Sequence, residues 1–147
     1  MASNPLVDQG TLNRVRASVV WVDHPELNVT AGYLGRDGIR LSLEGQSTAF
    51  LPTMTGAVTS PEPYMMINLT IHLLKTQALA QAYKAQMENI ALIGNGVVRP
   101  DLSIGIDPYD IVNCAIEGVR ELNFSGQDEG FVISCRGYYI LNNTLWE

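Results

Sequence analysis

The sequence predicts a mainly β protein, an antiparallel β-sandwich or partly closed barrel with one flanking α-helix. Three observations lead to this prediction. Most apolar runs alternate with polar residues at every second position, which is the period of a strand with one buried face. One stretch, at about residues 76–92, has helical spacing instead. Strands and helices do not alternate along the chain, so a parallel α/β sheet is not expected.

The first expected strand lies within residues 11–23, where Val19 and Trp21 fall on the same face. The run at residues 39–44 alternates in the same way. Residues 65–74 carry the clearest alternation of the chain, over about ten residues, which is long for a strand of a globular protein. These three runs are therefore expected to be strands with one buried face.

Residues 76–92 are rich in Ala, Gln, Leu and Lys, which are good helix formers. Their apolar side chains, Leu79 and Tyr83 among them, recur at three- and four-residue spacing, so one stripe of the helix should pack against a sheet. Gly94 follows as a stop signal. The run IGNGVV, residues 93–98, is accordingly interpreted as the helix stop followed by a turn.

Two further alternating runs follow, at residues 110–126 and 131–141. In the first, Cys114 and Ile116 are expected on one face and Ile111 on the other. The polar cluster SGQDEG separates the two runs, and such a cluster marks a turn. The sequence therefore predicts that they form an antiparallel hairpin.

The chain has 147 residues, and residues 1–147 are expected to form one domain. Charged residues make up 16% of it, against about 25% in an average protein. Such a low charged fraction favours a chain that buries part of its surface in an assembly. The net charge is −6, which argues against non-specific binding to phosphate backbones.

The sequence shows no catalytic or metal-binding constellation. The two histidines, His24 and His72, stand near no recognisable nucleophile motif. Cys114 and Cys135 are too far apart in sequence for a CxxC motif and are interpreted as buried, reduced thiols. We therefore expect no enzyme activity, no metal and no cofactor. No window approaches the roughly 20 apolar residues of a membrane span, and no secretory signal is seen, so a cytoplasmic protein is expected.

The segment Glu44–Met66, EGQSTAFLPTMTGAVTSPEPYMM, is too apolar for a solvated loop. If its flanking strands pair, it forms the tip of a very long hairpin. Exposed apolar surface of this kind marks a partner site, and its prolines are expected to interrupt strand pairing. In the alternative, the segment folds back over its own core as a lid. The residues expected to make contacts between subunits are Phe50, Leu51, Pro52, Met54, Val58, Pro61 and Pro63.

A long apolar arm before a strand, then the helix LAQAYKAQMENI and further strands, resembles the tail tube proteins of long-tailed bacteriophages. The opening NPLVDQGTLNRVRASV and the stretch TIHLLKTQALAQAY resemble those of contractile-tailed phages most. The resemblance covers nearly the whole chain as a pattern of elements, without a short diagnostic motif. It implies a fold close to that of the type VI secretion tube protein. It also implies hexameric rings that stack into a hollow tube, with the arm and both extended ends of the chain in the contacts.

The resemblance further implies a structural protein of the virion tail, assembled in the host cytoplasm. Its partners would be other copies of itself and the tail sheath, tape measure and baseplate proteins. Viral DNA would pass through without specific binding. An acidic inner wall would repel that DNA. The candidate acidic residues of the lumen are Asp37, Glu44, Glu117, Glu121, Asp128 and Glu129.

Three alternatives stay open at this point. The chain can be another tail ring component, such as a terminator or baseplate protein. It can be a tube protein of the type VI secretion kind. Least favoured is a small-ligand-binding β-barrel, which needs an apolar cavity with a few convergent polar groups.

Overall fold

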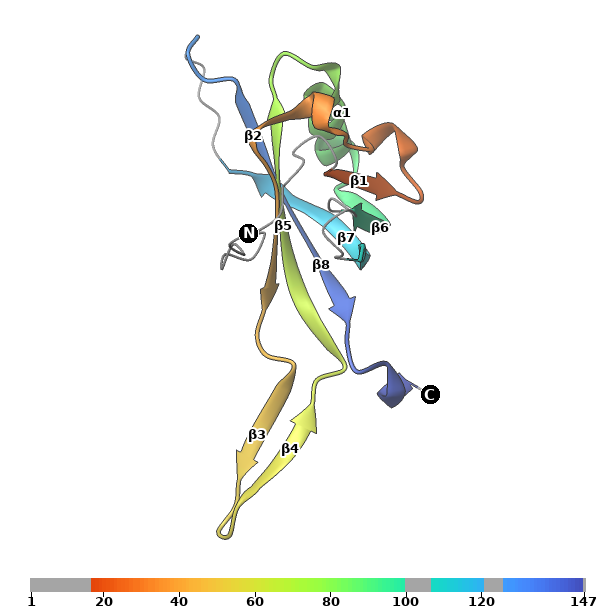
Figure 1. The fold of residues 1–147 in the computed structure, drawn as a ribbon. Coiled ribbons are helices and arrows are strands. Elements are labelled where there is room, and N and C mark those ends of the chain that lie inside the picture. The colour runs from red at the N-terminus through yellow and green to blue at the C-terminus, as the bar shows by residue number, and fades with distance from the viewer. Residues whose placement is uncertain (1–16, 100–106, 121–125, 147) are drawn as a thin grey trace, which may run out of the picture.

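The computed structural model describes residues 17–99, 107–120 and 126–146. Figure 1 shows a curled antiparallel sheet, a helix at one end and a narrow hairpin that projects from the other end. The sheet curves into half of a barrel. The predicted fold class is therefore confirmed, in its partly closed barrel form.

The six-stranded sheet has the strand order β1-β6-β7-β8-β5-β2, and all of its neighbouring strands pair antiparallel. Its strands are β1 (Ser18–Trp21), β2 (Leu34–Glu44), β5 (Tyr64–Leu74), β6 (Leu92–Arg99), β7 (Tyr109–Val119) and β8 (Gly130–Ile140). The projecting hairpin consists of β3 (Thr48–Pro52) and β4 (Ala57–Pro61). The helices are α1 (Ala78–Asn89) and the 3-10 turns η1 (Pro25–Leu27), η2 (Ala31–Tyr33) and η4 (Asn143–Trp146). Below, the six-stranded sheet and α1 together are called the body.

The alternation predicted for residues 65–74 is confirmed in β5. Five side chains of one face are buried, namely Met65, Ile67, Leu69, Ile71 and Leu73. Along the other face the side chains are exposed or half-buried. β5 lies between β2 and β8 and pairs with β8 along its whole length. Each of these aliphatic side chains stabilises the fold by about 1.5–3 kcal/mol relative to an exposed one.

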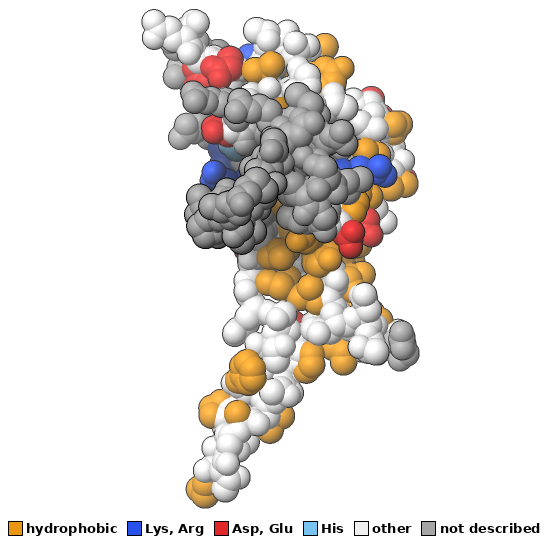
Figure 2. All heavy atoms as spheres, viewed as in Figure 1, with side chains coloured by type: hydrophobic (Ala, Val, Ile, Leu, Met, Phe, Trp, Pro, Cys, Tyr) orange, Lys and Arg blue, Asp and Glu red, His pale blue; other side chains and the backbone are white. Residues whose placement is uncertain are grey.

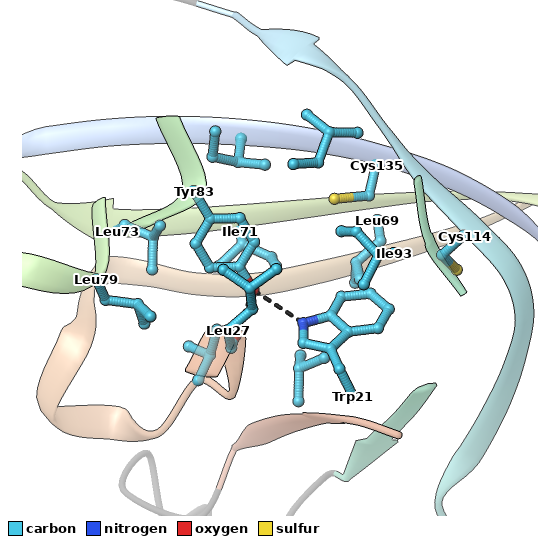
Figure 3. Packing of buried hydrophobic residues seen from close by; sticks show 14 of the residues in the cluster. Trp21, Leu27, Leu69, Ile71, Leu73, Leu79, Tyr83, Ile93, Cys114 and Cys135 are labelled. Atoms are coloured by element: carbon cyan, nitrogen blue, oxygen red, sulfur yellow. Dashed lines mark hydrogen bonds between the residues drawn. The ribbon is translucent and has the colours of Figure 1, made fainter. Parts of the chain in front are cut away.

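The helix packs on the core through Leu79, Ala80 and Tyr83, as its stripe predicts. Tyr83 and Trp21 lie side by side among buried aliphatic side chains (Figure 3). The Trp21 Nε1–H donates to the Tyr83 hydroxyl at 2.9 Å, and that hydroxyl donates to the carbonyl oxygen of Leu27 at 2.6 Å. This chain of hydrogen bonds joins β1, α1 and η1. Because Tyr83 is buried, its pKa is raised well above the ordinary value.

The interpretation of residues 93–98 as a helix stop and a turn is wrong. The helix ends earlier, at Asn89, and these residues belong to β6. A Cβ atom on Gly96 would lie 2.5 Å from Cε3 of Trp21, so the glycine makes room for the indole ring. Gly94 has a φ of 96° and lies where the pairing of β6 with β7 shifts register. Both glycines therefore serve a strand with a bulge and a close approach.

The face predicted for Ile111 is also wrong. Ile111 and Cys114 are both buried, although they are three positions apart, an odd number that regular alternation would place on opposite faces. Between them, Asn113 adopts a left-handed φ of 51°, and the pairing of β7 with β8 shifts between Val112 and Ala115. This irregularity reverses the alternation, so that Cys114 and Ile116 are buried as expected and Ile111 joins them.

We expect the substitution Gly137→Ala to destabilise the fold. A Cβ atom there would lie 2.5 Å from Cys114 Sγ and 2.9 Å from the carbonyl oxygen of Val112. Because one of these atoms is backbone, relief requires strand movement, which costs about 1–3 kcal/mol. Gly118→Ala is a matched control, since nothing lies within 4 Å of its added Cβ. Urea denaturation of both variants measures the effect, and equal stabilities would contradict the close packing.

Candidate assembly site

The projecting hairpin, residues 47–62, is here called the arm. All of its side chains from 50 to 61 are exposed. Phe50 is 65% exposed and Met54, at the tip, is fully exposed. Leu51 and Val58 are exposed by more than half. Figure 2 shows these apolar side chains spread along the arm, away from the body. A lid over the core would bury them, so the lid alternative does not fit this geometry.

The expectation that the prolines interrupt strand pairing within the arm is wrong. β3 and β4 form a regular ladder from Thr48↔Pro61 to Pro52↔Ala57. Pro52 and Pro61 each stand at the last position of their strand, where a missing N–H removes least from the ladder. The break lies instead at the root of the arm. There the β2–β5 ladder ends at the pair Glu44↔Met66, and Pro63 follows the arm.

The arm has two apolar faces. Directly paired residues of a ladder point to the same side of it. Leu51 pairs with Val58, so these two side chains form an apolar patch on one face. Phe50 pairs with Thr59 and lies on the opposite face. Both faces are exposed in the single chain, so a partner can cover each of them.

The apolar surface continues at the root of the arm. Tyr64 and Met66 of β5 and Ile140 of β8 are exposed there, and Tyr64 packs against Tyr138 with 5.6 Å between ring centroids. Leu145 and Trp146 of η4 are each more than half exposed. Figure 2 shows orange side chains where the arm joins the body. Tyr64 and Met66 lie within the segment Glu44–Met66 that the sequence singled out, and Leu145 and Trp146 lie in the C-terminal stretch that the resemblance places in the contacts. Ile140 was not among the expected contact residues.

The structure does not bring the five acidic lumen candidates that it describes together in one place. Glu44 accepts a hydrogen bond from the Arg136 guanidinium, and Glu117 lies 3.9 Å from the same group, so Arg136 partly neutralises both. Asp128 accepts a hydrogen bond from the backbone N–H of Gly130.

The remaining candidates lie elsewhere. Glu129 is exposed next to Asp128, and its carbonyl oxygen accepts from the backbone N–H of Lys75, just after β5. Asp37 is exposed in β2, close to the same end of β5. Asp37, Asp128 and Glu129 are therefore at the end of the sheet opposite the arm. Glu121 lies outside the described residues.

A hollow of about 360 Å³ lies on the polar face of the sheet. It is lined by Arg40, Ser42, Asn68, Thr70, His72, Arg120 and Val132. Nδ1 of His72 is 2.9 Å from the carbonyl oxygen of Gly38, which fixes the ring beside the two arginines. The sequence analysis did not predict this basic surface, because its residues come from strands that are distant in sequence.

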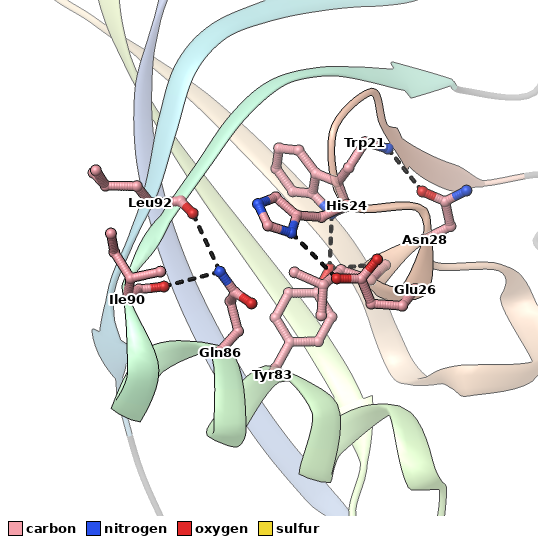
Figure 4. A network of polar contacts seen from close by, with 9 residues as sticks. Trp21, His24, Glu26, Asn28, Tyr83, Gln86, Ile90 and Leu92 are labelled. Carbon is pink, nitrogen blue, oxygen red and sulfur yellow. Dashed lines mark hydrogen bonds and ion pairs between the residues drawn. The ribbon is translucent and has the colours of Figure 1, made fainter.

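The other histidine takes part in local structural contacts (Figure 4). Nδ1 of His24 is 3.2 Å from a carboxylate oxygen of Glu26, and nearby the backbone N–H of Trp21 donates to the Asn28 side chain at 2.8 Å. The pKa of Glu26 is lowered, mainly by a backbone hydrogen bond to its carboxylate and to a smaller extent by the hydrogen bond with His24. Figure 4 shows this group in and around η1, next to Tyr83 of α1.

Both cysteines are buried, as expected, and neither forms a disulfide. Burial raises the pKa of Cys114 and of Cys135 to about 12, so both thiols stay protonated at neutral pH. Within residues 17–99, 107–120 and 126–146, no three His, Cys, Asp or Glu side chains are grouped to hold a metal ion. In the same residues, no helix is long and apolar enough for a membrane span.

Comparisons with known proteins give a match among solved structures. No protein-family model matches the chain. No curated protein matches it either. Among solved structures, it is similar to the anti-feeding prophage cap, described as a tube terminating cap. That similarity has a TM-score of 0.46 and 12% sequence identity, and it covers 93% of this chain and 92% of the other.

Proposed function

We propose that this protein is a structural component of a phage-type tail, and that its copies form stacked rings that build the hollow inner tube. The observation that carries the proposal is the arm, which projects from the body with apolar side chains exposed on both faces. The resemblance noted in the sequence supplies the kind of assembly and the expectation of hexameric rings. The protein is then neither an enzyme nor the carrier of a cofactor.

The exposed arm favours association of copies on energetic grounds. Each large apolar side chain of the arm gains about 1.5–3 kcal/mol when it is fully buried. Figure 1 shows the arm directed away from the body, so the body does not cover it. A contact between the arm of one copy and a different surface of the next is heterologous. Such contacts repeat into rings or into open filaments.

The open sheet also favours a ring. β1 and β2 are the outer strands of the half-barrel and are not paired to each other. The outer edge of β1 is covered within the chain, because Val19 exchanges two backbone hydrogen bonds with Val29. The edge of β2 is the one left for a partner. Exposed strand edges are prone to pair with other chains, so proteins cover or interrupt them. A neighbouring copy in a ring would cover the edge of β2. In this arrangement the arms join adjacent rings, DNA passes through the tube, and sheath, tape measure and baseplate proteins bind its outside and ends.

The purified protein tests this function. Sedimentation over a range of concentrations and electron microscopy should show rings that stack into long tubes. Single rings that do not polymerise would instead identify a terminator or baseplate component. A monodisperse monomer at high concentration, without tubes, would contradict the proposal.

A single arm substitution should weaken assembly without unfolding the body. We expect Phe50→Ser to raise the protein concentration needed for assembly at least about tenfold, because each 1.4 kcal/mol of lost contact is tenfold in affinity. Its stability should change by less than about 0.5 kcal/mol, since the side chain is exposed. Thr59→Ser, the directly paired residue, is the control. Light scattering and thermal unfolding measure the two effects, and unchanged assembly of Phe50→Ser would exclude this face from the contact.

A further inference from the structure

The C-terminal segment, residues 141–146, crosses the root of the arm. The backbone N–H of Leu141 donates to the carbonyl oxygen of Pro63 at 3.1 Å. The indole N–H of Trp146 donates to the same carbonyl oxygen at 3.2 Å. Both ends of the segment are thereby fixed to the one residue that connects the arm with β5.

Asn142, within this segment, holds both strands of the arm at once. Its side-chain amide donates to the carbonyl oxygen of Ser47 at 3.2 Å and to that of Glu62 at 2.7 Å. Ser47 precedes β3 and Glu62 follows β4, and the N–H of Glu62 donates to the Ser47 oxygen at 2.9 Å. A single amide group therefore bridges the two strand ends of the hairpin where the arm begins.

The backbone of Asn142 is adapted to this contact. Its φ of 48° lies in the left-handed region, which Asn tolerates better than most residues. This conformation turns the chain from β8 into η4, whose Leu145 N–H donates to the Asn142 carbonyl oxygen at 2.9 Å. The residue thus combines a sharp turn of the backbone with a side chain that has two donors.

The root of the arm needs such support. The main ladder stops at Glu44, and Gly45 follows with a φ of 94°. Pro63, on the opposite side of the hairpin, has no backbone N–H to donate. Between these points and the first arm pair, Thr48↔Pro61, the two strands are joined by few contacts of their own. A two-stranded hairpin on such a root would bend easily.

We propose that Asn142 and Trp146 are positioning residues that fix the direction of the arm relative to the body. The C-terminal segment then acts as a strap across the root. This inference goes beyond the proposed function, because it concerns a single copy. Its consequence for assembly rests on the proposed function, since a fixed arm meets its neighbour without first losing freedom of motion.

Distances between two spin labels can test the strap in single copies. One label is placed at the tip through Thr55→Cys and the other on the exposed side of α1 through Lys84→Cys. The native thiols do not compete for the label, because both are buried and protonated at neutral pH. The variants carry Phe50→Ser in addition and are measured below the concentration at which this background assembles.

Three variants and one control separate the contributions. Asn142→Asp keeps the shape but turns a carboxylate toward two carbonyl oxygens, and Asn142→Gly keeps the left-handed backbone without the amide. Both should widen the distance distribution at least twofold. Trp146→Phe keeps an aromatic ring but removes the indole N–H, and it should widen the distribution less. Asn143→Asp makes the same charge change one residue away and should leave the distribution unchanged.

Equally narrow distributions in the Asn142 variants and the unmodified background would overturn the proposal. Assembly is then measured with Phe50 restored, and the Asn142 variants should require a higher concentration to form tubes. A widened distribution with unchanged assembly would confirm the strap and contradict the arm contact of the proposed function. Weakened assembly without a widened distribution would contradict the strap alone.

Discussion

Replacement of Thr48–Pro61 by a two-residue Asn-Gly turn is expected to abolish assembly and to leave the body folded. Ser47 and Glu62 already face each other through a backbone hydrogen bond of 2.9 Å, so a tight turn can close the hairpin there. The removed side chains from 50 to 61 are all exposed, and the core cluster contains none of them. The melting temperature should therefore change by no more than a few degrees.

Thermal unfolding and electron microscopy of this one deletion distinguish the possible roles of the arm. A length-preserving variant with Thr53→Ser and Thr55→Ser is the control, and it should assemble normally. If the shortened protein still forms tubes, the arm does not join the rings. If its melting temperature falls by many degrees, the arm contributes to the stability of the body, as a lid would.

Tyr83→Phe is expected to cost about 2–5 kcal/mol of folding free energy, a large effect for the loss of one oxygen atom. The substitution leaves the Trp21 indole N–H and the Leu27 carbonyl oxygen without their hydrogen-bond partner. Trp21, Leu27 and Tyr83 are all nearly inaccessible, so water does not replace the hydroxyl. Each buried polar group without a partner costs about 1–3 kcal/mol.

Urea denaturation gives this free energy directly, and the melting temperature should fall by about 5–15 °C in a chain of this size. Tyr33→Phe is the control, because Tyr33 packs on the edge of the core and its hydroxyl has no partner among the described residues. A loss below about 1 kcal/mol for Tyr83→Phe would show that the buried groups find other partners.

The strand β5 and the helix α1 were predictable because each carries the period of its own structure. In β5 one half of the alternating side chains is buried in the core and the other half lies on a partly polar face. In α1 the apolar stripe through Leu79 and Tyr83 meets the sheet. Periodicity is a local property, so the sequence around these residues contains the information.

β6 was not predictable in the same way. Gly96 is required by the ring of Trp21, which precedes it by 75 residues and contacts it only in the folded sheet. The left-handed Asn113 is likewise needed by the register of the neighbouring strand. Locally, glycine suggests a turn, and only the partner strand shows that it makes space within a sheet.

In the candidate site, too, one part was predictable from the local sequence and the other was not. The arm was predictable because Phe50, Leu51 and Met54 are too apolar for a loop between two strands. Its root was not, because Asn142 meets Ser47 and Glu62 across 95 and 80 residues of sequence. Hydrogen bonds of this kind depend on where β8 ends relative to β5, which no local pattern shows.

The two tryptophans of the chain report on different parts of the molecule. Trp21 is 1% exposed and its indole lies in the core, whereas Trp146 is 57% exposed at the root of the arm. Their intrinsic fluorescence therefore has a shielded component and a solvent-facing component. In Trp146→Phe the emission follows unfolding of the core alone. In the proposed assembly, a blue shift of the Trp146 emission without a change in the Trp21 emission would mark the moment when a neighbouring copy covers the root. Association and folding could then be timed separately without any added dye.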